Sequence, residues 1–340
     1  MKIFTENGIS YRLPNGLSEF QYQMYIHLIN WKWKNITTEP GYHGKYQYDA
    51  IIPESYRDQH FPLYPPIVER FLAHQQAYPF KSHKFLGHMA SSQAACANLF
   101  LPILGDEKIA AAILKAVKPD LKRIATDYFD SGFRIEFWDE PDNRLNDHNK
   151  VSGTDSDIGI AYYNEAGELN LWLIEHKLSE PEFTTCGGYR SKNRSKTHSC
   201  GSIAAILNDN DLCYYHSGRQ YRYWDITSQN EIIFSRQNLL TYQDCPFKGG
   251  MNQLWRNQLL ALEIENSHSA RWPFKKVYFS VVYHPKNNSL LATLREFENL
   301  INHNERFFHF SSDKIIDAAR NISEKSITEW RQWYEGMYYW

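Results

Sequence analysis

Residues 153–180 hold the pattern that most restricts the fold, because they read as a β-hairpin. Two apolar runs, residues 158–163 and residues 169–178, flank a short segment of turn residues. Side chains alternate between the two faces of a strand, so Glu175 and Lys177 lie on the same face of the second run. A glutamate and a lysine at the end of an otherwise apolar strand are costly to bury without partners. The hairpin therefore predicts a polar site at the end of its second strand.

A third charged residue, Asp157, directly precedes the first apolar run. If the two runs pair around the turn, Asp157 and Glu175 reach the same point at one end of the hairpin. Two carboxylates at one point favour a hard divalent cation, and a lysine such as Lys177 beside them can orient or deprotonate a water. Asp155 is the alternative to Asp157. Asp157 is preferred because it leads the apolar run, which fixes its position.

Asp157 followed eighteen positions later by Glu175-His176-Lys177 resembles the motif of the PD-(D/E)XK nuclease superfamily. The triplet of an acidic residue, any residue and a lysine occurs three times in the chain. Only the triplet at Glu175–Lys177 ends an apolar run that is preceded by a second apolar run led by an aspartate. The resemblance implies an α/β fold with a restriction-endonuclease-like core, αβββαβ, in which helices flank a mixed central sheet. It also implies that Asp157, Glu175 and the carbonyl of His176 bind Mg²⁺ or Mn²⁺, while Lys177 orients or activates the attacking water.

Two further phrases flank the hairpin and are similar to phrases in a bacterial group of restriction endonucleases of this superfamily. The first, Ser-Ser-Gln-Ala-x-Cys-x-Asn-Leu-Phe, begins at Ser91 and predicts a helix with a serine cap. On it, Gln93 and Asn98 either face the site or are ordinary polar residues of a helix surface. The second, Gln-Leu-x-Arg-Asn-x-Leu-Leu-Ala, begins at Gln253 and predicts a helix on which Gln253 and Arg256 share a face. The resemblance implies that these two residues hold the water or the scissile phosphate.

The order of elements along the chain fits the same core. Residues 132–138 read as a strand. The resemblance implies that this strand can supply an additional metal ligand, for which Glu136 is the candidate. We predict a mainly helical, aromatic-rich N-terminal region at residues 1–87 and a nuclease domain at residues 88–340, with a cysteine-containing insertion at residues 181–247. The histidines of the N-terminal region show no ligand spacing, and we interpret them as solvated or core residues.

Four of the five cysteines lie in this insertion, and in a reducing compartment such a group favours a site for zinc or an iron–sulfur cluster. The four are Cys186, Cys200, Cys213 and Cys245. The absence of a Cys-x-x-Cys pair weakens the interpretation as a zinc ribbon, whereas some PD-(D/E)XK nucleases hold iron–sulfur clusters on widely spaced cysteines. His198 and His216 could complete a mixed zinc site, and unligated thiols are the alternative.

The insertion is also basic and interleaved with aromatic residues, which is what a groove needs to hold phosphates and bases. Its candidate nucleic-acid contacts are Arg190, Lys192, Arg194, Lys196, Arg219 and Arg222. A solvated insertion without such a role is the alternative. Because the net charge of the whole chain is only −2, any surface for nucleic acid must be a local patch.

The chain shows no apolar run long enough to span a membrane and no secretory signal, which favours a cytoplasmic protein. The resemblance implies a Mg²⁺-dependent hydrolase of the restriction or phage-defence type that cuts DNA, with RNA left open. The sequence leaves the oligomeric state open too, with a homodimer as one candidate because double-strand cutters of this fold often pair. One alternative is a nucleic-acid-binding or repair-accessory protein on a nuclease-like fold, with weak or no catalysis. Another is an unrelated α/β protein in which Glu175 and Lys177 form an ion pair at a strand end.

Overall fold

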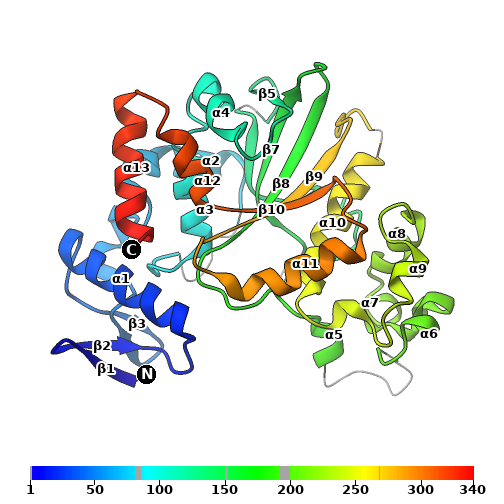
Figure 1. Ribbon diagram of the computed structural model, residues 1–340, viewed down its shortest axis with the longest axis horizontal. Helices are drawn as coiled ribbons and strands as arrows, with labels where there is room; N and C mark the ends of the chain where they lie inside the picture. The colour runs from blue at the N-terminus through cyan, green and yellow to red at the C-terminus, as the bar shows by residue number, and fades with distance from the viewer. Residues whose placement is uncertain (1, 81–85, 130, 150–151, 192–199, 268) are drawn as a thin grey trace.

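The centre of the molecule is a six-stranded mixed sheet with helices on both faces (Figure 1). The computed structural model describes residues 2–80, 86–129, 131–149, 152–191, 200–267 and 269–340. The strands are β5 (Leu121–Ile124), β6 (Phe133–Phe137), β7 (Ser156–Asn164), β8 (Leu169–Lys177), β9 (Val277–Tyr283) and β10 (Phe307–Ser311). Their order is β10-β9-β8-β7, and both β5 and β6 pair with the outer edge of β7. Strand β9 runs parallel to its two neighbours, and all other pairs are antiparallel. The predicted α/β class with a mixed central sheet is thus confirmed.

The hairpin predicted from residues 153–180 is the pair β7 and β8. Its register runs from Ile158 opposite Ile174 to Tyr163 opposite Leu169, as the alternating pattern requires. The turn closes with a hydrogen bond from the Gly167 N–H to a backbone carbonyl, and Gly167 has φ of +78°, which a glycine adopts without strain. The hairpin prediction is therefore confirmed.

The two faces of β8 belong to two separate hydrophobic cores, as the alternation predicts. Trp172 and Ile174 lie in one core, and Leu171 and Leu173 lie in the other. The first core is covered by α3 (Ser92–Phe100), α4 (Glu107–Leu114), α12 (Asp313–Ala319) and α13 (Lys325–Tyr338). The second is covered by α10 (Met251–Glu265) and α11 (Leu291–Leu300). The polar end of β8 therefore lies between two packed helical layers.

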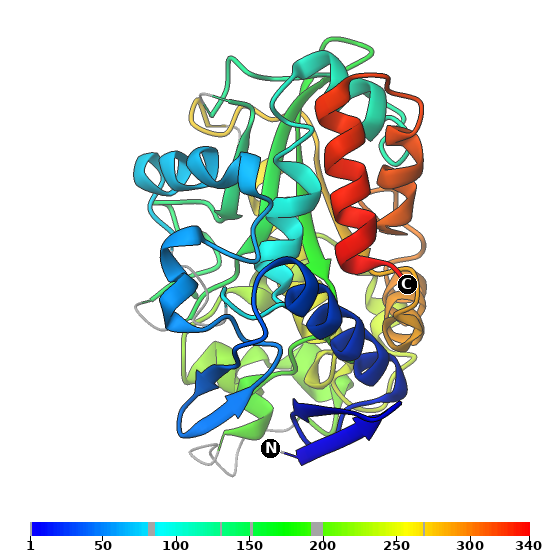
Figure 2. The same cartoon turned by 90° about the vertical axis from the view of Figure 1, so that its left-hand side faces the viewer.

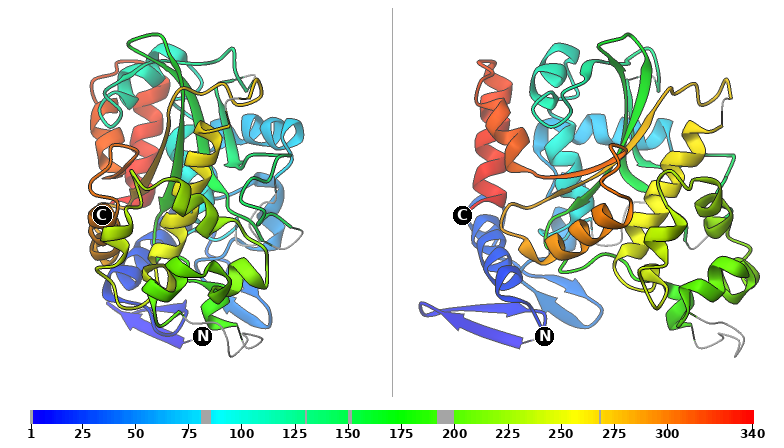
Figure 3. Two further views of the ribbon diagram at one scale, coloured as in Figure 1. Left: turned by 90° about the vertical axis from the view of Figure 1, so that its right-hand side faces the viewer. Right: turned by 45° about the vertical axis from the view of Figure 1, so that its right-hand side comes forward.

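The described part of the insertion is a set of short helices that packs on α10 (Figure 3). They are α5 (Gly187–Arg190), α6 (Ile203–Asn208), α7 (Tyr214–Ser217), α8 (Tyr223–Gln229) and α9 (Arg236–Leu239), with 3-10 turns at Asn210–Leu212 and Pro246–Lys248. The rings of Trp224 and Phe247 pack on Trp255 of α10 at centroid distances of 5.0 Å and 4.1 Å. Because its aromatic residues build this core, the described part of the insertion is a folded layer and not a solvated loop.

The N-terminal segment lies across one end of the molecule, next to the C-terminal helix (Figure 2). It contains β1 (Lys2–Glu6), β2 (Ile9–Leu13), α1 (Glu19–Asn35), β3 (Gly41–His43), β4 (Tyr46–Tyr48) and α2 (Val68–Ala77), with 3-10 turns at Glu54–Gln59 and Pro65–Ile67. Trp31 of α1 meets Trp333 of α13 edge-on at 5.6 Å, so the two ends of the chain share one core. The division of domains after residue 87 stays a prediction. Within the described ranges, no helix is long and apolar enough to cross a lipid bilayer.

Candidate active site

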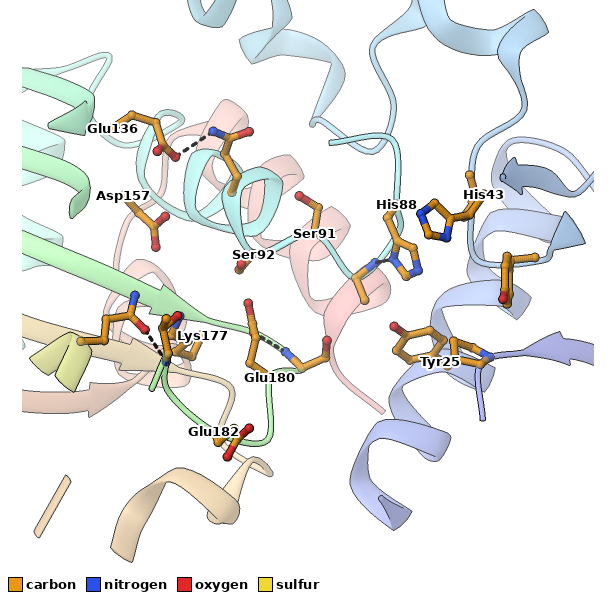
Figure 4. A pocket seen from close by; sticks show the side chains of 18 residues that line it. Tyr25, His43, His88, Ser91, Ser92, Glu136, Asp157, Lys177, Glu180 and Glu182 are labelled. Atoms are coloured by element: carbon orange, nitrogen blue, oxygen red, sulfur yellow. Dashed lines mark hydrogen bonds between the residues drawn. The ribbon is translucent and has the colours of Figure 1, made fainter. Parts of the chain in front are cut away.

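Three carboxylate side chains come together from three neighbouring strands. Figure 4 shows two of them, Glu136 and Asp157. Strand β6 pairs with β7 on both sides of Glu136, Ile135 with Ile158 and Phe137 with Ser156, which places Glu136 level with Asp157. The pairing of β7 with β8 ends at Ile158 and Ile174, and beyond it the Asp157 carboxylate accepts a hydrogen bond from the His176 N–H at 2.6 Å. The Asp157 carboxylate thus takes the place of the β7 carbonyl that would otherwise accept from the His176 N–H. This contact fixes Asp157 beside Glu175.

The position of Glu136 depends on an unusual backbone. Regular alternation would put Phe133, Ile135 and Phe137 on one face, but Phe137 lies in the opposite core. The reversal occurs at Glu136, which has φ of +50°. Gln93 of α3 donates a hydrogen bond of 2.7 Å to the Glu136 carboxylate and holds it at this edge. Backbone strain of this kind costs about 1–3 kcal/mol and clusters at functional sites.

Lys177 and Gln253 both contact the carboxylate of Glu175. The Lys177 ammonium lies 2.8 Å from Glu175 Oε1, and the Gln253 amide donates to the same oxygen at 2.7 Å. The Gln253 carbonyl oxygen in turn accepts from the Thr184 N–H at 3.1 Å, which ties the start of the insertion to α10. The structure therefore brings together Asp157, Glu175, Lys177 and Gln253, as the sequence pattern predicts.

Burial and mutual repulsion set the protonation of this cluster. Burial, together with Asp155 and Glu175, raises the pKa of Glu136 to about 8. Burial and then the neighbouring carboxylates raise the pKa of Asp157 well above its usual range. Burial opposes the charge of Lys177, but the carboxylates around it outweigh burial and raise its pKa. Lys177 is therefore a cation at neutral pH, which suits orienting a water or offsetting negative charge more than accepting a proton.

The donor set of this cluster fits a hard divalent cation, which takes oxygen ligands and offsets negative charge. In a strand, the N–H and C=O of one residue point to the same side, so the carbonyl of His176 points toward Asp157 as its N–H does. The imidazole of His176 is buried on the other face, where burial lowers its pKa to about 3. Among the described residues, no three His, Cys, Asp or Glu side chains are arranged as ligands of one ion. One oxygen of Glu175 is already engaged by both Lys177 and Gln253.

The cluster opens into two cavities. The larger is a cleft of about 680 Å³ that extends from Asp157 and Lys177 to the N-terminal segment. The smaller, about 240 Å³, lies toward the insertion and is lined by Arg256 and Asp155 as well as by Asp157. Residues that line both cavities, among them Glu136, Asp157 and Gln253, form the boundary between them.

Arg256 lies behind the carboxylates and not in the larger cleft. Its guanidinium lies 3.5 Å from the Thr154 hydroxyl. Burial disfavours its charge, but Tyr223 and Asp147 outweigh burial and raise the pKa of Arg256. Asp155, the alternative to Asp157, pairs with His148 at 2.8 Å, so that its carboxylate already has a cationic partner when His148 is protonated.

The predicted basic residues of the insertion have different surroundings where the structure describes them. Arg190 and Arg219 are exposed. Arg222 donates to the backbone carbonyl of Arg144 at 2.9 Å and lies 3.5 Å from a carboxylate oxygen of Glu263, so it is engaged within the fold. Lys192, Arg194 and Lys196 lie outside the described residues, as does His198.

Comparison with known proteins identifies the family of this chain. Residues 26–336, nearly its whole length, match the family described as restriction endonuclease associating with ARP. The chain belongs to this family. No curated protein and no solved structure matches it. The family match suggests a nuclease or defence role for this protein. The matched residues include both the carboxylate cluster and the insertion.

The four cysteines of this family member come from separate turns of the insertion. Cys186, Cys213 and Cys245 are buried and Cys200 is partly buried, and no disulfide joins any of the four within the described residues. Burial and the nearby thiols of Cys213 and Cys200 raise the pKa of Cys186 to about 11. Burial and the neighbouring thiols also raise the pKa of Cys245 well above its usual range. A hydrogen bond of 2.9 Å joins the Cys245 N–H to the Cys200 carbonyl. The thiols therefore gather in one region, although the described residues of that region do not form a ready metal site.

Two other polar residues singled out from the sequence have structural roles. Asn98 is fully buried and donates to Pro62 and Tyr338 while it accepts from Tyr64, so it braces the core and not the site. His216 lies between the carboxylates of Asp211 and Asp225, at 2.8 Å and 3.1 Å. Sequence reasoning missed a different group, the N-terminal side chains that line the larger cleft, because no local spacing marks them.

Proposed function

We propose that this protein is a metal-dependent nuclease that hydrolyses phosphodiester bonds of DNA in a restriction or defence role. The observation that carries the proposal is the buried cluster of Glu136, Asp157, Glu175 and Lys177 at the edge of a cleft. The family match supports it. We also propose that α3, β6, β7, β8, α10 and β9, in that order, form a restriction-endonuclease-like core. A cytoplasmic location and a homodimer stay predictions.

In the proposed reaction, Asp157, Glu175 and the His176 carbonyl would hold Mg²⁺ or Mn²⁺, with Glu136 as a further ligand. A bound cation supplies Lewis-acid stabilisation of the phosphoryl oxygens. Lys177 orients the attacking water and offsets the negative charge that develops on the phosphate. Gln253 positions Glu175, which it contacts directly.

The proposal is tested by incubating the purified protein with supercoiled DNA, single-stranded DNA and RNA, each with Mg²⁺ or with EDTA. We expect cleavage of DNA that requires the divalent ion, because the carboxylates repel the phosphate without a cation between them. Cleavage that persists in EDTA would contradict the metal-dependent mechanism.

A second function is a nucleic-acid-binding or repair-accessory role with weak or no catalysis. The observation that favours it is that Lys177 and Gln253 already contact Glu175 Oε1. In the same assay, tight DNA binding without metal-dependent cutting would support this second function over the first.

We further propose that the four cysteines hold zinc or an iron–sulfur cluster, because buried thiols that share one region are suited to these metals. Protein purified without oxygen is expected to contain zinc or iron by elemental analysis, with a broad absorption band at roughly 400 nm if a cluster is present. Cys213→Ser should lower the metal content at least about fivefold. Cys96→Ser is the matched control, because Cys96 lies in α3 outside the insertion. Equal metal content in both variants, or none in the wild type, would show unligated thiols.

A further inference from the structure

The larger cleft continues from the carboxylate cluster to a wall of aromatic rings in the N-terminal segment. The rings belong to Tyr25 on α1, to His43 and Tyr48 on the β3–β4 hairpin, and to His88 before α3. Figure 4 shows His43, His88 and Tyr25 grouped on one side of the cleft, and Asp157 and Lys177 on the other. From the sequence, histidines such as His43 and His88 are interpreted as solvated or core residues, and the structure adds that both line this cleft.

Backbone pairing builds this wall as a fixed part of the fold. Ile52 donates to the Gly87 carbonyl at 2.9 Å, and Met89 donates to the Ala50 carbonyl at 2.8 Å, so the segments around residue 51 and residue 88 form a short bridge. Gly41 donates to the Ile51 carbonyl at 2.9 Å, and a Cβ at Gly41 would lie 2.4 Å from the Ile51 side chain. The hairpin that carries His43 therefore packs directly against the bridge that carries His88.

The chemistry of the wall is aromatic and neutral. Tyr25 and His88 meet edge-on with ring centroids 5.3 Å apart. The Nδ1 of His88 accepts a hydrogen bond from the Ala90 N–H at 3.0 Å, so the ring proton is on Nε2, which is a hydrogen-bond donor. Burial, and then His43, lower the pKa of His88 to about 4, which keeps the ring uncharged at neutral pH. Such a wall suits stacking and hydrogen bonding more than binding of an anion.

The charges of the cleft exclude a phosphate from this end. Glu180 and Glu182 line the cleft, and burial and then the nearby Glu180 raise the pKa of Tyr25. Among the described lining residues, Lys177 is the one lysine or arginine of the cleft. Lys177 is already engaged by Glu175. Among the described lining residues, a phosphate near the rings would meet carboxylates and no unengaged cation, whereas an uncharged planar ring would meet aromatic faces and neutral donors.

We propose that this wall binds an unpaired nucleobase of the substrate, so that the adjoining phosphate lies at the carboxylate cluster. The cleft volume is in the range of sites that hold small molecules, and aromatic side chains stack on bases of every kind. A base within a duplex is not available for such stacking, so the substrate is single-stranded at this point or has its base turned out of the helix. This inference rests on the proposed nuclease function, because the nucleic acid is the assumed ligand.

The test measures binding in EDTA, where cleavage plays no part. Two short single strands of equal length are compared by fluorescence anisotropy, one with bases throughout and one abasic at several central positions, so that their phosphate charges are equal. The wild type is expected to bind the strand with bases about tenfold more tightly. A variant with Tyr25→Ala and His88→Ala should lose this preference while its affinity for the abasic strand is unchanged.

His43→Ala gives a second variant, because its side chain is exposed and its loss leaves the core intact. It should reduce the preference by a smaller factor, about twofold to threefold. Tyr42→Ala is the matched control: Tyr42 is 65% exposed, neighbours His43 on the same strand and does not line the cleft. It should leave the preference unchanged.

Equal binding of the two strands by the wild type, or an equal loss for both strands in the variants, would overturn the inference. The two proposals fail separately. A preference for the strand with bases, without any cleavage in Mg²⁺, would support the base-binding wall and contradict the nuclease proposal. Cleavage without this preference would support the nuclease proposal and contradict the base-binding wall.

Discussion

Lys177→Met is expected to lower Mg²⁺-dependent DNA cleavage by about 10³-fold. Lys177 is 7% exposed, and its ammonium lies 2.8 Å from Glu175 Oε1. Methionine keeps most of the length of the side chain but has no charge, so the variant removes the cation that offsets charge on the reacting phosphate. The measurement is the initial rate of nicking of supercoiled DNA at equal protein concentration.

Loss of the lysine also leaves Glu175 without its ion-pair partner, so stability must be separated from catalysis. A double variant, Lys177→Met with Glu175→Gln, removes both charges and should unfold at nearly the temperature of the wild type while it stays inactive. Lys115→Met is the matched control, because Lys115 forms an exposed ion pair with Glu165 and such pairs contribute little. Wild-type activity in the single variant would assign the observed cleavage to a contaminant or to another residue.

The parts of the site that could be predicted are those with a local period. Glu175 and Lys177 are two positions apart on one strand, and Asp157 leads the partner strand, so alternation and a short turn suffice to bring them together. Gln253 could be predicted from the helix phrase that begins with it. The same reasoning failed for Asn98, since helix periodicity alone does not show which buried face a polar side chain occupies.

The features that could not be predicted depend on contacts between distant segments. His43 and His88 come together through the isolated β-bridge between Ile51 and His88. No periodic pattern of residues in the sequence marks such a bridge. Strands β5 and β10 are only four and five residues long, too short for a clear pattern of alternation. Aromatic residues of the insertion, such as Trp224, suit base stacking by composition, but their place in the core depends on Trp255 of a later helix.

The position of Glu136 shows a further limit of pattern reasoning. Its strand could be predicted, but the side-chain direction changes at a positive φ that no regular strand has. Gln93 holds the carboxylate from a different layer of the fold. Where a site stores backbone strain, the local rules of strand geometry fail at the residue of interest.

Asp157→Asn is expected to abolish cleavage, with a loss of at least about 10³-fold, and yet to stabilise the protein in EDTA. The amide oxygen of asparagine can still accept the hydrogen bond from the His176 N–H, so the link between β7 and β8 is kept. The substitution removes a buried negative charge that lies beside two other carboxylates. The gain in the free energy of unfolding should be about 1 kcal/mol at pH 8.

The pH dependence gives this prediction its sign. Because the folded-state pKa of Asp157 is raised, and that of Glu136 is raised to about 8, the folded protein binds more protons than the unfolded chain between their ordinary pKa values and about pH 8. The free energy of unfolding in EDTA must then fall as the pH rises through this window, and it must fall less steeply in Asp157→Asn. Urea unfolding at pH 5.5, 7 and 8.5 measures both slopes.

Mg²⁺ should stabilise the wild type at the higher pH but not the variant, since only the wild type keeps the carboxylate that binds the ion. A variant less stable than the wild type at every pH would instead make Asp157 a structural cap of β8.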